Sequence, residues 1–323
     1  MDKEFDVYGI GNPLIDLLVQ ISTQKLESLS VHKGVMNLID LERRQYLLNN
    51  LSDWTVLPGG SCANTIIALS DLGLNTVYGG SIGRDNLGEQ FEENMSQLGV
   101  TSALRRKVLP TGSSIILITE DADRSQNTYL GACQEYSIED VDIDKIRKSK
   151  SLYFTGYMWD TESQKRALLH AIDVAKDSNT EIIFDVADPF AVNRSKDDFI
   201  KLMKYDVDFI FANFEEAKTL TGEITKDSII EKMKEMGPSS GVVKDGKRGS
   251  YAYKDDKVFD IDVYQVKAVD TTGAGDMYAA GFIYGMARNY GMQKSGEIAS
   301  LVAGKVVEQV GARLGYSLKE IIN

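Results

Sequence analysis

The chain of 323 residues has no long hydrophobic run. A membrane-spanning helix needs about 18 or more predominantly apolar residues in succession, and no stretch of this sequence approaches that length. The first residues, "MDKEFDVYGIGN", also lack the basic start and long apolar stretch of a secretory signal. We therefore expect a cytoplasmic protein that has no membrane partner.

Cysteine and histidine are scarce, with two of each. Cys62 and Cys133 are isolated, so there is no CxxC pattern for redox chemistry or zinc, and we expect two reduced, buried thiols. His32 lies in a turn-like segment and His170 in an amphipathic helical pattern. Any acid–base chemistry is therefore expected to fall to carboxylates.

Positive charge and the common phosphate-binding motifs are also missing. The 48 acidic residues outnumber the 36 basic ones, for a net charge of -12, which disfavours nucleic acid as a partner. No GxxxxGK[ST] loop occurs, and neither "GIGNPL" nor "GAGDMY" completes GxGxxG. A Walker-type NTPase and a dinucleotide-binding Rossmann enzyme are thus disfavoured, and a small ligand fits better.

Short apolar segments alternate with helical patterns along most of the chain. Strands are predicted at 5–11, 76–83, 151–156, 181–187, 208–213 and 240–246, with helical segments between them. This alternation predicts an α/β fold with a doubly wound, mostly parallel sheet and helices on both faces. With only five prolines and no proline-rich linker, residues 1–323 are expected to form a single domain.

Two regions break the alternation and predict a small β lid. Residues 14–22 and 34–40 are strand-like and precede a polar helical segment, and residues 113–121 and 125–132 are typical of paired strands around a charged turn. We expect the lid to be formed by about 14–50 and 102–133. An exposed strand edge in such a lid would invite pairing, so both a monomer and a homodimer are open.

The segment "DTTGAGDMYAAGF", residues 270–282, is the strongest candidate site. Small residues ahead of a helix leave its first amides facing outward, and the amides of Gly273, Ala274, Gly275 and Asp276 could hold a transferring phosphoryl group. Asp276 would then accept the proton of an attacking hydroxyl. The alternative is a simple helix cap, which does not need the two glycines.

Two further patterns carry candidate ligands. In "ANFEEAKTLTG", Asn213 and Glu216 lie three residues apart at a helix start, where they could hold a hydrated magnesium ion. The same spacing is also that of a capping box. Arg124, in the charged turn of the lid, is either a solvated charge or a clamp for phosphate when the lid closes.

Together these segments resemble the PfkB (ribokinase-like) carbohydrate kinase family. "DTTGAGDMYAAGF" is similar to its C-terminal signature, "PGGSCANTIIALSDLG" and "GSIGRDNLGE" to its N-terminal glycine region, and "NFEEAKTLTG" to its N-x-x-E element. The similarity spans essentially the whole chain in the right order. Within the family, "GIGNPLIDLLV" resembles the start of adenosine kinases.

The resemblance implies a ribokinase-like fold and a kinase that depends on ATP and Mg2+. It makes Asp276 the base and Gly273 to Gly275 the anion hole. The nucleotide would be bound by Asn213, Gly246, Gly249 and Thr272. Asn213 and Glu216 would organise the magnesium ion through water, and a monovalent cation, usually K+, would lie beside Asp270 and Thr272.

The resemblance also implies a substrate site. Asn12 and Asp16 would face a ribose, with Gly59, Gly60, Asn64 and Arg124 also binding substrate. The chemistry is suitable, because the Asp16 carboxylate can accept from two vicinal hydroxyls and Asn64 can bridge a further one. In "TGYMWD", Tyr157 and Trp159 offer a stacking face for a base, or else pack the end of the sheet.

The sequence thus predicts an ATP-dependent kinase acting on the primary hydroxyl of a ribonucleoside, adenosine first, or of a related sugar. Alternatives are a ribokinase or fructokinase and an inosine-guanosine kinase, since free sugars share the hydroxyl pattern. A protein that binds a sugar or nucleoside without catalysis, and a ribokinase-like lyase, are disfavoured. The intact Gly273, Gly275 and Asp276 argue against the first, and the Asn12 and Asp16 pair against the second.

Overall fold

The computed structural model describes residues 2–121 and 123–322 and contains two sheets. The larger sheet has nine strands in the order β14-β13-β12-β11-β10-β9-β1-β5-β6. Neighbouring strands are parallel, except that β13 is antiparallel to both β12 and β14. The strand bounds are β1 Phe5–Ile10, β5 Thr76–Gly83, β6 Thr101–Lys107, β9 Ser149–Thr155, β10 Glu181–Asp185, β11 Phe209–Asn213, β12 Ser240–Lys244, β13 Ser250–Lys254 and β14 Lys257–Ile261.

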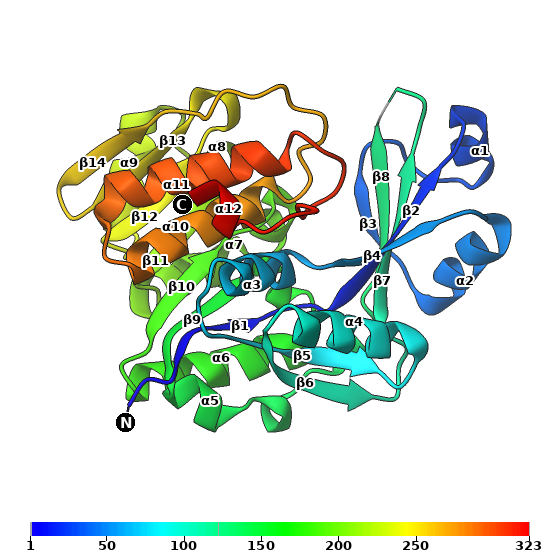
Figure 1. Cartoon of the computed structure of the whole chain (residues 1–323), viewed down its shortest axis with the longest axis horizontal. Helices are drawn as coiled ribbons and strands as arrows, with labels where there is room; N and C mark the ends of the chain where they lie inside the picture. The colour runs from blue at the N-terminus through cyan, green and yellow to red at the C-terminus, as the bar shows by residue number, and fades with distance from the viewer. Residues whose placement is uncertain (1, 122, 323) are drawn as a thin grey trace.

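Helices cover both faces of this sheet (Figure 1). Because successive strand residues point to opposite faces, Phe209 and Phe211 belong to one buried cluster, while Ile210 and Ala212 belong to the other. The first cluster includes residues of α3 (Ser61–Asp71), α4 (Asn86–Gln97), α10 (Ala274–Ala287) and α11 (Gly291–Val306). The second includes residues of α5 (Ile143–Arg147), α6 (Glu162–Asp177), α7 (Pro189–Tyr205), α8 (Phe214–Thr221) and α9 (Lys226–Glu235). The predicted ribokinase-like, doubly wound α/β fold is confirmed.

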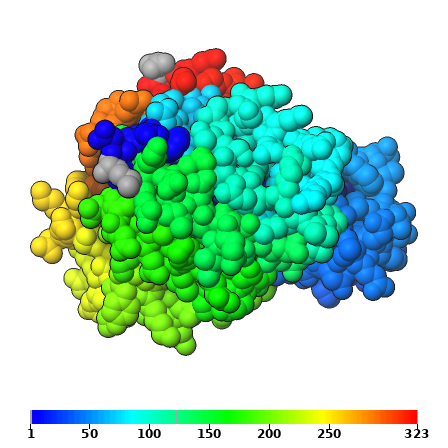
Figure 2. All heavy atoms as spheres, turned by 90° about the horizontal axis from the view of Figure 1, so that it is seen from below, coloured from blue at the N-terminus to red at the C-terminus, as the bar shows by residue number. Residues whose placement is uncertain are grey.

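The smaller sheet forms the lid, at one end of the molecule (Figure 1). Its five strands follow the order β3-β8-β7-β2-β4. Their bounds are β2 Leu14–Gln20, β3 Met36–Leu38, β4 Thr55–Gly59, β7 Gly112–Ile118 and β8 Arg124–Tyr129, and α1 (Thr23–Ser28) and α2 (Leu41–Asn50) belong to the same part of the chain. Figure 2 shows that this blue N-terminal part projects beyond the body of the protein.

The expected lid boundaries, 14–50 and 102–133, differ from the structure in two places. Strand β4, Thr55–Gly59, pairs with β2 and so belongs to the lid. Its proline and short length concealed it, although a sheet edge tolerates proline. Strand β6, Thr101–Lys107, pairs with β5 and so belongs to the large sheet. Residue 122, in the predicted charged turn, lies outside the described residues.

Two expectations drawn from missing features can be compared with the structure. Within residues 2–121 and 123–322, no helix combines the length and the apolar character needed to cross a membrane. Cys62 and Cys133 are free and buried, as predicted. Burial raises the pKa of the Cys62 thiol well above its ordinary value, which keeps this thiol protonated and unreactive.

Candidate active site

A cleft of about 1040 Å³ lies between the lid and the carboxyl ends of the large sheet. Parallel strands deliver their last residues to one edge, so the ends of β9, β10, β11 and β12 contribute Thr155, Asp185, Asn213 and Lys244. The lid contributes alternate residues of its strands, all on the face turned toward the body. They are Leu14, Asp16, Met36, Leu38, Ser114, Ile116, Arg124, Gln126 and Thr128.

The N-terminus of α10 opens into this cleft. Gly273 caps the helix in the left-handed conformation, with φ 74°, and a β-carbon there would come within 2.5 Å of Ala312. Glycine is therefore required both by the backbone angle and by the close approach. No side chain caps the helix. The amide of Ala274 donates to Thr271 O, so of the four amides predicted to face a ligand this one is engaged within the protein.

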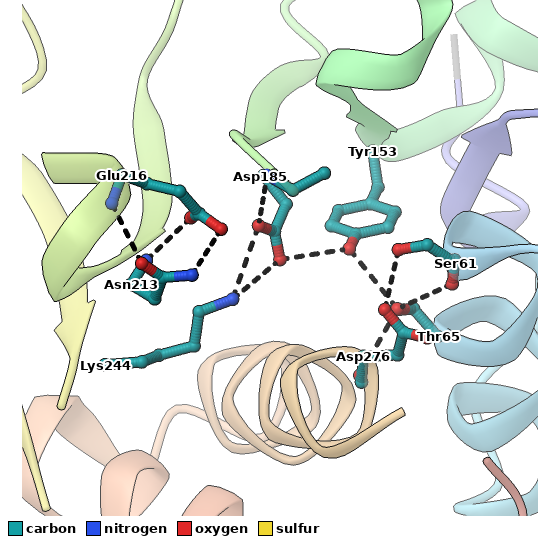
Figure 3. A network of polar contacts seen from close by, with 9 residues as sticks. Ser61, Thr65, Tyr153, Asp185, Asn213, Glu216, Lys244 and Asp276 are labelled. Carbon is teal, nitrogen blue, oxygen red and sulfur yellow. Dashed lines mark hydrogen bonds and ion pairs between the residues drawn. The ribbon is translucent and has the colours of Figure 1, made fainter. Parts of the chain in front are cut away.

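Asp276 lies in the first turn of α10 and lines the cleft (Figure 3). One carboxylate oxygen accepts from Ser61 Oγ at 2.6 Å and the other from Asn64 Nδ2 at 2.9 Å, both on α3. The carboxylate thus does not cap its own helix. Burial raises the pKa of Asp276 to about 6, against the lowering effect of the two hydrogen bonds. Such a carboxyl group is ionised at neutral pH and basic enough to take a proton.

A polar network connects Asp276 to two residues that the sequence analysis did not single out, Asp185 and Lys244 (Figure 3). Thr65 and Tyr153 link the helix to Asp185, and Lys244 Nζ donates to the Asp185 carboxylate at 3.1 and 3.3 Å. Both residues are the last of their strands, β10 and β12. Both are polar side chains near the carboxyl ends of the predicted strands 181–187 and 240–246, where ligands of parallel sheets bind, so the sequence carried a signal for them.

Lys244 places its ammonium beside the start of α10. A β-carbon built on Gly275 would lie 3.5 Å from Lys244 Nζ. Burial alone would lower the pKa of Lys244, but the carboxylates of Asp185, Glu216 and Asp276 hold it above its ordinary value. The cleft therefore contains a fixed positive charge next to the open helix end.

Asn213 and Glu216 form the capping box that the sequence left as an alternative. Asn213 N donates to Glu216 Oε2 at 2.7 Å, and Glu216 N donates to Asn213 Oδ1 at 2.9 Å. Both residues also line the cleft. Burial raises the pKa of Glu216 to about 7, with Lys244 acting in the opposite direction. No cluster of three or more metal-ligating side chains occurs within the part of the chain that the structure describes.

The predicted substrate residues gather on the lid side of the cleft. Asp16, Gly60, Asn64 and Asn12 line it, although the oxygen of the Asn12 amide already accepts from Gln164 Nε2 at 2.5 Å. Burial raises the pKa of Asp16 to about 7. Gly59 does not line the cleft; a β-carbon there would lie 2.4 Å from Asp16 Oδ2, so this glycine makes room for the carboxylate.

Arg124 reaches from the lid to the body of the protein. Its guanidinium donates to Asp270 Oδ2 at 2.6 Å and to Thr272 Oγ1 at 2.8 Å. Thr272 lines the cleft, but Asp270 does not. Burial alone would raise the pKa of Asp270, yet donors from Gly311, Thr272 and Arg124 hold it below its ordinary value. That Asp270 adjoins a monovalent cation stays a prediction. In this structure the Arg124 guanidinium compensates the charge of the Asp270 carboxylate.

The remaining predicted positions divide between the cleft and the core. Gly246 and Gly249, in the turn between β12 and β13, line the cleft with φ of 54° and 91°. Tyr157 also lines it, and its hydroxyl donates to Asp188 at 3.2 Å. Trp159 packs against Phe154, Phe184 and Phe199, so the packing alternative holds for this residue and it offers no stacking face.

The fold and the cleft define an α/β enzyme with a lid over the N-terminus of α10. Glycines leave this helix start open, the Asp276 carboxylate lies there, and the Lys244 ammonium lies beside it. The pfkB family carbohydrate kinase pattern matches residues 29–319, so the chain belongs to this family and is a kinase with an alcohol acceptor.

Solved structures share the whole architecture. A probable sugar kinase from Rhizobium etli CFN 42 superposes with a TM-score of 0.92 at 34% identity, covering 99% of this chain and 98% of that one. Adenosine kinase from Sinorhizobium meliloti gives a TM-score of 0.91 at 34% identity, covering 98% of both chains. A 5-dehydro-2-deoxygluconokinase from Clostridium perfringens (strain ATCC 13124) is 29% identical over 262 residues, which is 77% of this chain and 78% of the relative. The neighbours thus include both nucleoside and sugar kinases.

Proposed function

We propose that the protein transfers the γ-phosphoryl group of ATP to the primary hydroxyl of a ribonucleoside, adenosine first. The observation that carries the proposal is the position of Asp276, whose carboxylate lies at the open N-terminus of α10 in the same cleft as Asp16. The likeness to an adenosine kinase over 98% of both chains supports the nucleoside acceptor.

The chemistry assigns one role to each group around α10. The acceptor oxygen forms a bond to the γ-phosphorus while the bond from that phosphorus to the β–γ bridging oxygen breaks, and ADP leaves. Asp276 accepts the hydroxyl proton. The amides at Gly275 and Asp276, together with the Lys244 ammonium, stabilise the charge on the equatorial oxygens.

Asn213 and Glu216 would bind the magnesium ion of the nucleotide through water. Their oxygen atoms suit this hard cation, and both residues line the cleft. Asn213 ends β11 directly beside Lys244 at the end of β12. When bound, the ion neutralises charge on the β- and γ-phosphates. Gly246 and Gly249 would border the nucleotide, and Thr272 would adjoin its phosphates. K+ beside Asp270 would require Arg124 to release that carboxylate.

The lid supplies a surface that a free sugar does not need. Asp16 can accept from two vicinal ribose hydroxyls, because no described side chain donates a hydrogen bond to its carboxylate. Next to it the lid presents the apolar side chains of Leu14, Met36, Leu38 and Ile116 to the cleft. A planar base fits against such a surface, and this favours a nucleoside over a simple sugar.

The acceptor is tested by measuring ADP release with adenosine, inosine, ribose and fructose. At about 0.3 kcal/mol per heavy atom, the roughly ten atoms of a bound base contribute about 3 kcal/mol. We therefore expect kcat/KM for adenosine to exceed that for ribose by about 100-fold. A higher kcat/KM with ribose or fructose would establish the sugar-kinase alternative. Ligand binding without any ADP release would establish the non-catalytic one.

Gln126 provides a finer test of the nucleoside proposal. Its side chain lies on the cleft face of the lid, across from Met36 on β3 and Ile116 on β7. It forms no hydrogen bond with any other side chain of the described residues. A glutamine carboxamide matches the amino edge of adenine. Purine riboside lacks only the exocyclic amino group, so the wild type should prefer adenosine by about 3- to 10-fold. Gln126→Leu should abolish that preference in kcat/KM, and an unchanged preference would exclude Gln126 from base recognition.

A further inference from the structure

The loop that follows α11 brings three consecutive residues to the candidate active site. Gly311 N donates to Asp270 Oδ2 at 2.7 Å, and Ala312 packs against Gly273 at the start of α10. Arg313 Nε donates to Asn64 Oδ1 at 3.0 Å, and its Nη1 donates to Asn94 Oδ1 at 3.0 Å. The guanidinium therefore lies between α3 and α4, in contact with Asn64, whose side chain donates to Asp276.

The burial of this guanidinium is costly. Its Nη2 is buried and has no hydrogen-bond partner among the described residues, and no salt bridge joins Arg313 to a carboxylate there. Burial lowers the pKa of Arg313 to about 10, against the opposing effect of Asp16 and Asp276. An arginine kept for stability would usually pair with a carboxylate, since an uncompensated buried charge destabilises a fold. This arrangement points to a role in the site.

The chain of hydrogen bonds defines the orientation of the Asn64 amide. A guanidinium has only donors, so the oxygen of the Asn64 amide must face Arg313. The amide nitrogen then necessarily faces Asp276 Oδ2, to which it donates at 2.9 Å. If the amide turned over, its oxygen would face a carboxylate oxygen and repel it.

We propose that Arg313 is a positioning residue that fixes the Asn64 amide so that its nitrogen holds the Asp276 carboxylate in place as the base. This inference rests on the proposed role of Asp276. Arg313 touches neither reacting atom; it acts through Asn64. The sequence analysis missed it because the residue lies in an irregular segment far from every strand end, near the end of the chain.

The decisive measurement is the pH dependence of kcat at saturating acceptor, because Asp16, whose pKa is raised to about 7 by burial and lowered by Arg313, would add a limb of its own to kcat/KM. Activity is lost as the pH falls through the pKa of the base, and removal of Arg313 lets the amide turn and also removes a cation, both of which favour protonated Asp276. We expect Arg313→Met to move the acid limb of the profile upward by about one pH unit. A variant that was merely less stable would lower the rate at every pH and leave the limb in place, which would overturn the proposal.

Other charged and titratable groups face Asp276, and all of them are retained in this variant, although the loss of Arg313 also raises the pKa of Asp16. They are Asp16, Cys62, Tyr153, Tyr157, Asp185 and Lys244. A direct effect of the Arg313 charge is separated by repeating the substitution in an Asn64→Ala background. If Arg313 acts through the amide, the shift seen with Asn64 present should be largely absent without it. A shift of the same size in both backgrounds would contradict the proposal.

Two further variants keep the test sound. Arg313→Lys retains the charge but has one donor nitrogen where arginine has three, and it should move the limb in the same direction by a smaller amount. It carries the test should the methionine variant not fold. Arg106→Met, which removes an exposed ion pair with Glu92, is the matched control and should leave the profile unchanged.

Failure of the proposed function would be distinguishable from failure of this inference. If the wild type forms no ADP with any acceptor, the proposed function fails. The pKa of Asp276 is then measured by carboxyl-carbon NMR, with Asp276→Asn used for assignment. An Asp276 pKa higher in Arg313→Met than in the wild type would still support the positioning role, and equal values would refute it.

Discussion

Replacing Asp276 by asparagine is expected to lower kcat by about 100- to 10,000-fold, the range typical of a lost general base. Asparagine has nearly the same shape and can still accept from Ser61 Oγ, which donates to Asp276 at 2.6 Å. It cannot take up the hydroxyl proton. Binding of the acceptor, measured by calorimetry, should stay near normal because Asp16 and the lid are unchanged.

The same substitution should also change the pH profile. Burial raises the pKa of Asp276 to about 6, so wild-type kcat, measured at saturating acceptor so that Asp16 is engaged, should fall as the pH drops below that value and the carboxylate is protonated. The residual activity of Asp276→Asn should lack this limb. The matched control is Asp255→Asn, in the turn between β13 and β14, which should behave as the wild type. Comparable turnover in Asp276→Asn and the wild type would remove Asp276 from the base role.

Part of this site follows from where the predicted strands end. Polar residues at the ends of parallel strands meet at one edge, and Asn12 and Asn213 lie at the ends of the predicted strands 5–11 and 208–213. Both line the cleft. The alternation of strands and helices likewise predicted the doubly wound sheet, because burial on both faces leaves a pattern of short apolar strands.

What the sequence did not reveal depends on which strands are neighbours. Asp185 and Lys244 end the apolar strands β10 and β12, and a strand pattern predicts burial but not partners. Only β11 separates their strands, with Asp185 paired to Phe211 and Lys244 to Asn213. The long Lys244 side chain spans that distance and donates to the Asp185 carboxylate. Arg313 was missed for a different reason, since only tertiary packing brings an irregular loop against α3.

The lid boundaries were missed because sheet membership is decided by pairing rather than by local pattern. Strand β4 is exposed along Thr55, Val56 and Leu57, as an edge strand is, and its short sequence resembles a loop. Strand β6 ends in three basic residues, Arg105 to Lys107, so its sequence is not that of a buried apolar strand. Its parallel pairing with β5 is a long-range contact that no local signal reports.

Replacing Lys244 by methionine is expected to lower kcat by about 100-fold, with little change in KM for the acceptor. The side chain volume is kept, but the positive charge beside α10 is lost. Removal of a donor that stabilises charge in the transition state typically costs about 100- to 1,000-fold in kcat. Initial rates of ADP release over a range of acceptor and ATP concentrations would measure both constants. Lys244→Arg keeps the charge and should retain more activity than the methionine variant.

A second explanation of such a loss is that Lys244 only neutralises Asp185, whose carboxylate it contacts at 3.1 Å. The two explanations differ in the double variant Asp185→Asn with Lys244→Met, which removes both charges together. If Lys244 stabilises the transferring phosphoryl group, the double variant should be as slow as Lys244→Met. If the lysine only compensates a buried carboxylate, the double variant should recover most of the activity, because no unpaired charge is then left in the cleft. Recovery would assign Lys244 to the stability of the cleft and leave the amides of α10 as the anion hole.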